Sequence, residues 1–355
     1  MSPPMPAYRS LIRFFCALAL VLNWPMTAQA QQPAAGTQAD TLPLADVHFH
    51  LMWFMTPQEL KERMEQHHVR WVVGAGAIEG LTGVESFARD LEARKLLGNR
   101  YLPSVGWMSI RRADADVGLA RLYTDETSSQ REALLKLLDE QLSSGQQAVF
   151  SELHPNALTS TTIRQLLRRL PTDAPLFREL YKLSIKHKVP LPLHMQWHPE
   201  SVEQLGRLLA SDREGVVLLS HCGKDSEAGQ IRIFFEQHPN VLCDLGFRSP
   251  PQAAAESGRD PARTIYWGAG LFSKPGIRPA WAQLIEDYPD RFMVAVDDVH
   301  SWSTYDEVIK VIRTGLLAQL RPETAEKVAY KNAVRVFRLQ EPPAVQAPSA
   351  PPAGG

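Results

Sequence analysis

Short apolar runs alternate with amphipathic stretches along the chain from residue 42 to residue 340. The apolar runs are rich in β-branched residues and nearly continuous in hydrophobicity, which is typical of parallel strands covered on both faces. They occupy residues 42–50, 69–75, 100–107, 147–153, 189–195, 215–221, 240–246 and 291–297. Eight strand–helix units over about 300 residues predict an α/β fold of the (β/α)8 or TIM-barrel type.

Helix signals lie between these runs. Thr56, Pro57 and Glu59 supply an N-cap, a proline in the first turn and an acid three residues after the cap. Further helices are expected at 84–97, 129–143, 176–187, 200–210, 226–237, 279–288 and 304–319. The alternative fold is an open doubly wound sheet, which usually has a glycine-rich turn after its first strand. Histidines occupy that place here, so the barrel is favoured.

The N-terminal thirty residues do not fit the strand–helix pattern. Arg9 and Arg13 precede an apolar run at 14–22, and small residues flank Gln29 before a cleavage point after Ala30. This order predicts a secretory signal peptide at 1–30 and a periplasmic or secreted protein. The alternative, an uncleaved membrane anchor, needs a longer apolar run than this one.

The segments that flank the predicted barrel domain, 42–340, have few residues that could build a core. Residues 31–41 are rich in Gln, Ala and Gly, and residues 341–355 are rich in Pro, Ala and Gly. Such compositions predict a disordered linker before the domain and a disordered tail after it.

Charge and cysteine content restrict the partners of the chain. The 355 residues carry a net charge of −1, and removal of 1–30 leaves 36 basic against 39 acidic residues. Without a basic patch, nucleic-acid binding is not expected, and after cleavage neither is membrane contact. An oxidising compartment would permit a disulfide between Cys222 and Cys243, but two cysteines are not a disulfide framework, so free buried thiols are favoured. The sequence leaves the oligomeric state open.

Metal-ligand residue types stand at the carboxyl ends of five predicted strands. In the first strand, Asp46, His48 and His50 recur at every second position, so alternation predicts that they share a face. The other four ends carry Glu152 with His154, His194, His221, and Asp297. Singly, each would be an ordinary core histidine or a capping acid. Because barrel active sites form at this end, five such ends together predict a metal site.

Residues around this site are expected to support it or to contact a substrate. Asp46 would lie deeper in the barrel than His48 and orient an imidazole rather than bind the metal. Substrate contacts are expected from Trp197 and His198 after the fifth strand, Arg248 after the seventh and His300 after the eighth. The long segment 247–278 is interpreted as a partly ordered lid. A surface arginine is the alternative for Arg248.

Four motifs resemble the amidohydrolase superfamily, most closely its amidohydrolase-related branch of metal-dependent hydrolases and decarboxylases. They are ADVHFH (45–50), PLPLH (190–194), LLSHCG (218–223) and RFMVAVDD (291–298), and the resemblance extends from residue 46 to residue 339. It implies that His48, His50, His194 and Asp297 bind metal. It also implies that His221 either binds a second metal or polarises the substrate. The branch's common lysine in strand 4 is missing, and Glu152, a carboxylate able to bridge two metals, stands near its place.

The expected cofactor is a divalent ion, with zinc favoured over manganese or iron and one ion favoured over two. Asp297 would transfer the proton of an attacking water, and His221 would stabilise developing negative charge. The leading hypothesis is an exported hydrolase of an amide, ester or lactone bond in a small molecule. The alternatives are a non-oxidative decarboxylase of an aromatic or unsaturated carboxylic acid, and a barrel that binds metal or ligand without catalysis.

Overall fold

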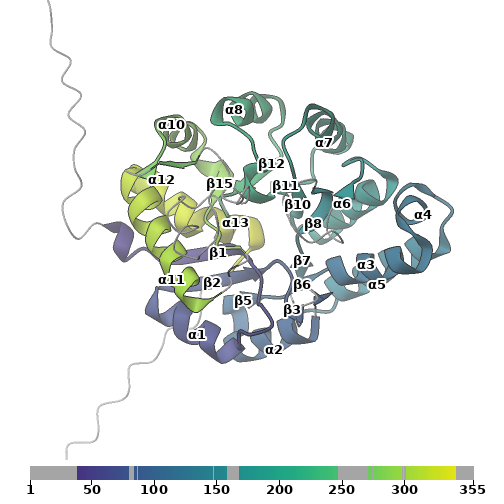
Figure 1. Cartoon of the computed structure of the whole chain (residues 1–355), viewed down its shortest axis with the longest axis horizontal. Helices are drawn as coiled ribbons and strands as arrows, with labels where there is room; N and C mark the ends of the chain where they lie inside the picture. The colour runs from purple at the N-terminus through teal and green to yellow at the C-terminus, as the bar shows by residue number, and fades with distance from the viewer. Residues whose placement is uncertain are drawn as a thin grey trace, which may run out of the picture. The chain divides into compact units, whose positions relative to one another are not determined.

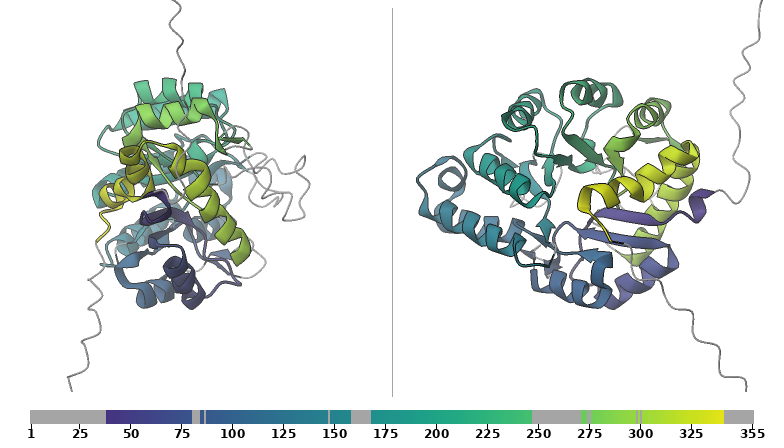
Figure 2. Two further views of the ribbon diagram at one scale, coloured as in Figure 1. Left: turned by 90° about the vertical axis from the view of Figure 1, so that its left-hand side faces the viewer. Right: turned by 180° about the vertical axis from the view of Figure 1, so that it is seen from behind.

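Parallel strands occupy the centre of the structure and helices surround them (Figures 1 and 2). The computed structural model describes residues 38–79, 84–85, 87–146, 148–157, 168–246, 271–273, 276–297, 299 and 301–340. The predicted signal peptide, most of the linker and all of the tail therefore lie outside the described residues. So do Arg248, His300 and nearly all of the predicted lid.

The first half of the chain contributes four strand positions. β1 (Leu44–Phe49) pairs in parallel with β2 (Val69–Gly74), and β2 pairs with β5 (Tyr101–Leu102). One residue further on, β6 (Ser104–Val105) pairs in parallel with β7 (Val149–Phe150). The third and fourth predicted strands are thus each interrupted, the fourth at Ser151 and Glu152 before β8 (Leu153–Ala157) begins.

The second half continues the same parallel order and returns to β1. The successive strands are β8, β10 (Leu191–Met195), β11 (Val217–Leu219), β12 (Val241–Asp244) and β15 (Phe292–Met293). Beyond β15, the Val47 N–H donates to Val294 O at 3.3 Å and the Asp297 N–H donates to His48 O at 2.7 Å. These bonds complete the circuit, and the predicted (β/α)8 barrel is confirmed.

Most predicted helices are present within three residues of their expected ends. These are α1 (Pro57–Gln66), α2 (Phe87–Leu97), α5 (Ser129–Leu142), α6 (Pro175–His187), α7 (Pro199–Ser211), α8 (Ala228–Gln237), α10 (Pro279–Asp287) and α11 (Trp302–Val311), which continues as a π-helical turn over Ile312–Leu316. The capping box predicted at Thr56 is present. The other α-helices of the described residues are α3 (Trp107–Val117), α4 (Leu119–Thr124), α12 (Pro322–Glu326) and α13 (Asn332–Phe337), and the sequence 326–337 also resembles the terminal helix of the amidohydrolase-related branch.

Short antiparallel strand pairs accompany the parallel strands. They are β3 (Ile78–Glu79) with β4 (Val84–Glu85), β8 with β9 (Arg168–Arg169), and β13 (Phe272–Ser273) with β14 (Gly276–Ile277).

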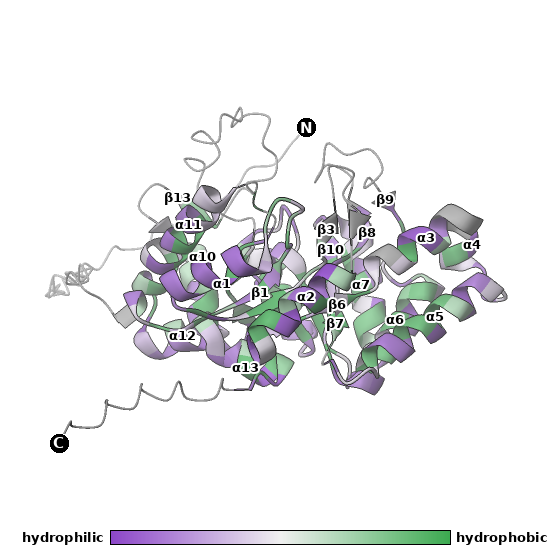
Figure 3. Cartoon of the chain, turned by 90° about the horizontal axis from the view of Figure 1, so that it is seen from below, coloured by the Kyte–Doolittle hydropathy of each residue, from purple (hydrophilic) through white to green (hydrophobic). Residues whose placement is uncertain are grey.

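The core has two parts, as expected for a barrel inside a ring of helices. Apolar side chains from most strands of the circuit, with Trp71 the largest, form one cluster inside the barrel that also includes Phe337 of α13. A larger cluster fills the layer between strands and helices. Hydrophobic colour dominates around β1 and β7 in Figure 3, whereas the surrounding helices show both colours. No helix in the described part of the chain has both the length and the hydropathy to cross a membrane.

Cys222 and Cys243 form a disulfide, so the prediction of free buried thiols is wrong. β11 and β12 are neighbours in the sheet, and the Cα atoms of the two cysteines lie 4.6 Å apart. Sequence spacing alone did not reveal that the two strands carrying the cysteines are adjacent.

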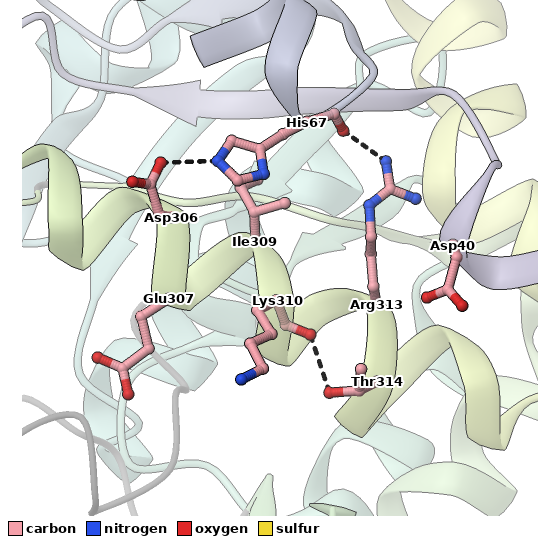
Figure 4. A pocket seen from close by; sticks show the side chains of 8 residues that line it. All are labelled: Asp40, His67, Asp306, Glu307, Ile309, Lys310, Arg313 and Thr314. Carbon is pink, nitrogen blue, oxygen red and sulfur yellow. Dashed lines mark hydrogen bonds and ion pairs between the residues drawn. The ribbon is translucent and has the colours of Figure 1, made fainter. Parts of the chain in front are cut away.

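A surface pocket of about 640 Å³ lies near the amino-terminal ends of β1 and β2 (Figure 4). Arg313 forms part of its wall and donates to three backbone carbonyls. These are Ala39 O at 2.6 Å, Leu42 O at 3.0 Å and His67 O at 2.6 Å. The His67 ring pairs with Asp306 at 2.6 Å. Arg313 therefore links the segment that precedes β1 to the end of α1.

Replacing Arg313 with methionine is expected to lower the free energy of unfolding by about 2 kcal/mol, because buried carbonyls lose a charged donor. Urea unfolding followed by circular dichroism measures the change. Arg321→Met is the matched control, since the Arg321 side chain is exposed and pairs with Glu286 at the surface. Equal stability losses in the two variants would show that Arg313 has no special role.

Candidate metal centre

Buried ionisable side chains from five strand ends meet at the carboxyl-terminal end of the barrel. None is more than 9% exposed. They are His48 and His50 at the end of β1, Glu152 between β7 and β8, His194 on β10, His221 in the turn after β11, and Asp297 after β15. The structure thus brings together the six residues predicted as ligands.

A β-bulge places His48 in this group. The β1–β2 ladder advances from Asp46 to Phe49 on β1 while β2 advances only from Val72 to Gly74. An extra residue of this kind breaks the alternation of faces. Val47 belongs to the cluster inside the barrel, although it directly precedes His48. Asp46 therefore does not share the face of His48 and His50, and the strict alternation predicted from the sequence is wrong here.

The ligand atoms of His48, His50 and Asp297 lie close together, and Glu152 Oε2 lies near the two histidine nitrogens. The Nε2 atoms of His48 and His50 are 3.3 Å apart. Asp297 Oδ1 lies 3.3 and 3.6 Å from these two nitrogens, and Glu152 Oε2 lies 3.5 and 3.6 Å from them. Four ligands placed tetrahedrally at zinc's usual bond length lie about 3.3–3.5 Å from one another. His48, His50 and Asp297 could therefore hold one metal ion, with Glu152 Oε2 near enough to the two nitrogens to be a further ligand.

The tautomers of the two histidines show why this group needs a cation. His48 Nδ1 lies 3.0 Å from a carboxylate oxygen of Asp244, and His50 Nδ1 lies 3.0 Å from Gly76 O. Both partners are acceptors, so both Nδ1 atoms carry hydrogen and a neutral ring offers a lone pair at Nε2. Two lone pairs thus converge with two carboxylate oxygens, of which Glu152 Oε2 also accepts from His154 Nε2 at 2.8 Å, and a proton or a metal ion between the four atoms would stabilise this arrangement.

The second oxygen of Glu152 belongs to another group of ligand atoms. Glu152 Oε1 lies 2.9 Å from His194 Nδ1 and 3.1 Å from His221 Nε2, and these two nitrogens are 3.2 Å apart. His221 Nδ1 faces Gly246 O at 3.2 Å and Asp297 Oδ2 at 3.1 Å. Both faced atoms are acceptors, so His221 Nε2 presents a lone pair. Glu152 therefore stands between two sets of metal-ligand atoms.

Burial and neighbouring charges shift the pKa values of the site in opposite directions. Burial alone would lower the pKa of His48, but the carboxylates of Asp297, Glu152 and Asp244 raise it well above its usual value. Burial would raise the pKa of Glu152, yet His154, His48 and His194 hold it well below the usual range. The Glu152 carboxylate is thus ionised at neutral pH. The carboxylates around His48 favour its positively charged form, so the site attracts cations.

Burial has the larger influence on three other groups. It lowers the pKa of His221 and of His154 to about 4, so both rings are neutral at pH 7. It raises the pKa of Asp46 to about 7, against the hydrogen bonds that Asp46 accepts from Val296 and His48. Neutral imidazole is the form that binds metal.

Asp244 orients the His48 ring and the backbone of His221, and this residue was not predicted from the sequence. Its Oδ2 accepts from the His48 ring, while its Oδ1 accepts from the backbone N–H groups of His221 and Gly246, both at 3.0 Å. Burial raises its pKa, but His48 and His221 outweigh burial and lower it. Asp46, expected to orient an imidazole, instead accepts from the backbone N–H groups of His48 at 3.3 Å and Val296 at 2.9 Å. An acid at the end of the apolar run 240–246 was the available signal.

The backbone is left-handed at two of the ligands. His221 has φ 56° and Asp297 has φ 73°. Residues other than glycine seldom adopt this conformation, and such residues concentrate at functional sites.

Aromatic side chains pack near the candidate ligands. His154 Nε2 lies 2.8 Å from Glu152 Oε2, and its ring is sandwiched between His194 and Trp107 with centroid distances of 4.5 and 4.6 Å. The Trp197 ring packs edge-on to Phe234 and lies close to Gly223. His198 is exposed at the N-cap of α7. A substrate role for Trp197 and His198 stays a prediction.

No family model matches the chain, and neither does any curated protein. Among solved structures, a probable 2-pyrone-4,6-dicarboxylic acid hydrolase from Acinetobacter baumannii with bound citric acid is 12% identical, with 84% of this chain and all of that chain covered at a TM-score of 0.49. An amidohydrolase from Burkholderia multivorans with bound zinc is 15% identical, with 80% and 89% covered at 0.44.

A dihydroxybenzoic acid decarboxylase from Polaromonas sp. JS666, with bound manganese and the inhibitor 2-nitroresorcinol, is 12% identical, with 81% and 87% covered at a TM-score of 0.43. Amidohydrolases and decarboxylases are the kinds of enzyme that the motifs in the sequence resemble. Because these TM-scores are below 0.5, the interpretation of the candidate metal centre rests on its own geometry.

Proposed function

We propose that this chain is an exported metal-dependent hydrolase that acts on an amide, ester or lactone bond of a small molecule. The observation that carries the proposal is the convergence of four acceptor atoms of His48, His50, Glu152 and Asp297 at 3.3–3.6 Å for the measured pairs. The carboxyl-terminal end of the barrel, where they meet, is where barrel enzymes have their active sites.

The donor set supports two ions rather than the one favoured from the sequence. His48, His50, Asp297 Oδ1 and Glu152 Oε2 would hold the first ion. His194 Nδ1, His221 Nε2 and Glu152 Oε1 would hold the second, with room in its coordination for a further ligand. Imidazole and carboxylate ligands suit zinc, and manganese and iron are the alternatives.

The protein's own residues would transfer the proton and hold the metal ligands in place. A bound divalent ion lowers the pKa of water and polarises a carbonyl oxygen. Asp297 would accept a proton from the attacking water and return it to the leaving group. Asp244 and Gly76 O hold the two β1 imidazoles in the tautomer that binds metal. Both nitrogens of His221 face other site residues, which supports a ligand role over direct contact with the substrate.

Export is proposed on the order of charged, apolar and small residues in 1–30. The Cys222–Cys243 disulfide supports it, because disulfides persist in oxidising compartments such as the periplasm.

Turnover of a substrate panel tests the proposed reaction. The chain without residues 1–30 is loaded with zinc or manganese and given aryl esters, lactones and N-acyl amino acids, alongside aromatic carboxylic acids with CO2 release monitored. We expect hydrolysis of at least one ester, lactone or amide and no CO2 release.

Chelator-treated protein serves as the control and should regain turnover when metal is returned. Release of CO2 without hydrolysis would assign the decarboxylase alternative. Protein that binds no metal would contradict both enzymes.

A further inference from the structure

The Cys222–Cys243 disulfide joins two positions that each adjoin a residue of the candidate metal centre. Cys222 directly follows His221, and Cys243 directly precedes Asp244. His221 supplies a ligand atom, and Asp244 accepts hydrogen bonds from the His48 ring and from the His221 backbone. A covalent bond thus links the segment that carries a ligand to the segment that orients it.

The segment that carries His221 is a turn between two points of attachment to the sheet, the end of β11 at Leu219 and the bridge between Lys224 and Gln196. The β11 ladder ends at Leu219, which pairs with Cys243, and His221 lies beyond it. His221, Cys222 and Gly223 follow one another at φ 56°, 52° and 69°. Only the glycine adopts this left-handed conformation without strain. An unconstrained chain would leave it at the two other residues.

The segment that carries Asp244 is anchored. In β12, Cys243 pairs with Leu219 on one side and Phe292 on the other, and Asp244 pairs with Met293 of β15. Both residues are fully buried. Cys243 is held in the ladder of β12. The disulfide therefore restricts the movement of Cys222 and of the strained turn after β11.

We infer that the Cys222–Cys243 disulfide is a positioning device that holds His221 for metal binding. This inference rests on the proposed function for its chemical meaning. Because Asp244 stays in its ladder when the disulfide is absent, the effect is selective. The His194–His221 group loses a fixed ligand, whereas the ligands of the His48–His50 group remain in place.

The test replaces both cysteines, Cys222→Ser with Cys243→Ser, so that no single thiol remains to bind zinc. Metal-free protein is titrated with zinc against a chromophoric chelator. We expect the affinity of one ion to fall about 10- to 100-fold, as when a ligand loses its orienting partner, and that of the other to change less than about threefold.

Amide hydrogen exchange in metal-free protein supplies a readout that does not depend on the metal. The His221 amide, which donates to Asp244 Oδ1, should exchange faster in the double variant, while the amides of β11 should not. Leu209→Ala is the control for general loss of stability, because Leu209 is buried on α7 away from the site. If the serine variant does not fold, Cys222→Ala with Cys243→Val restores apolar volume.

Unchanged zinc affinities together with unchanged exchange at His221 would overturn the inference and leave the disulfide a general stabiliser. A similar loss of both ions in the Leu209 control would overturn the claimed selectivity. Faster exchange at His221 in a protein that binds no zinc even with its cysteines intact would uphold the positioning of the turn while refuting the proposed function.

Discussion

Replacing Asp297 with asparagine is expected to lower kcat about 10³-fold while the protein stays folded and retains at least one metal ion. Asparagine keeps an oxygen where Asp297 Oδ1 approaches His48 and His50, at 3.3 and 3.6 Å. It cannot accept and return a proton, a function that contributes about 10²–10⁴-fold to turnover in enzymes. Steady-state kinetics, with the metal content of the same sample measured by atomic emission, tests this result.

Asp46→Asn is the matched control for the loss of a buried carboxylate. Burial raises the pKa of Asp46 to about 7, so its neutral form is already accessible at neutral pH. Its oxygen accepts backbone hydrogen bonds that asparagine can still accept. We expect less than a tenfold change in kcat. Equal losses in both variants would refute a special role for Asp297 in proton transfer, and so would full activity of the Asp297 variant.

Glu152→Gln is expected to lower the metal content from two ions per chain to one or none. Glu152 is the residue whose two oxygens face separate ligand groups. The amide offers one oxygen, and its NH2 group carries no negative charge and has no lone pair for a metal. We expect the affinity for the second ion to fall more than about 100-fold, beyond the usual effect of losing an orienting partner. Metal analysis after dialysis and a zinc titration measure the change.

Glu286→Gln provides the comparison for loss of a charge far from the site, since Glu286 pairs with Arg321 at the surface. It should keep the metal content of the unaltered chain. Two tightly bound ions in the Glu152 variant would show that this carboxylate does not bridge.

The barrel could be predicted from the sequence because the strands are apolar runs covered on both faces, and most of the major helices have an amphipathic pattern. α3 and α4 were missed because α3 begins inside an apolar run that reads as a strand, and Gly118 separates the two helices. The break in the fourth strand was also missed. Ser151 and Glu152 donate from the backbone to Val105 O and Ala75 O, partners on other strands that no local pattern reveals.

The ligands of the candidate metal centre could be predicted because they stand at strand ends, a position that the alternation alone locates. The sequence could not predict the direction in which each side chain points or which distant residue it contacts. A single-residue bulge separates Asp46 from the face of His48, and the partner of the His48 ring is Asp244, which lies 196 residues away. The disulfide was missed for the same reason, because it depends on which strands are neighbours.

The convergence of ligand atoms in the candidate metal centre also links the lifetime of the folded chain to the metal supply of its surroundings. An ion that binds only the folded state adds stability by mass action, about 2.7 kcal/mol when its free concentration is 100 times its dissociation constant. Without that ion this added stability is lost, and a proton on His48 offsets the charge of the buried carboxylates in its place. A metal-starved medium would then hold more of the chain open to proteases, so that scarcity of the cofactor removes the protein as well as its activity.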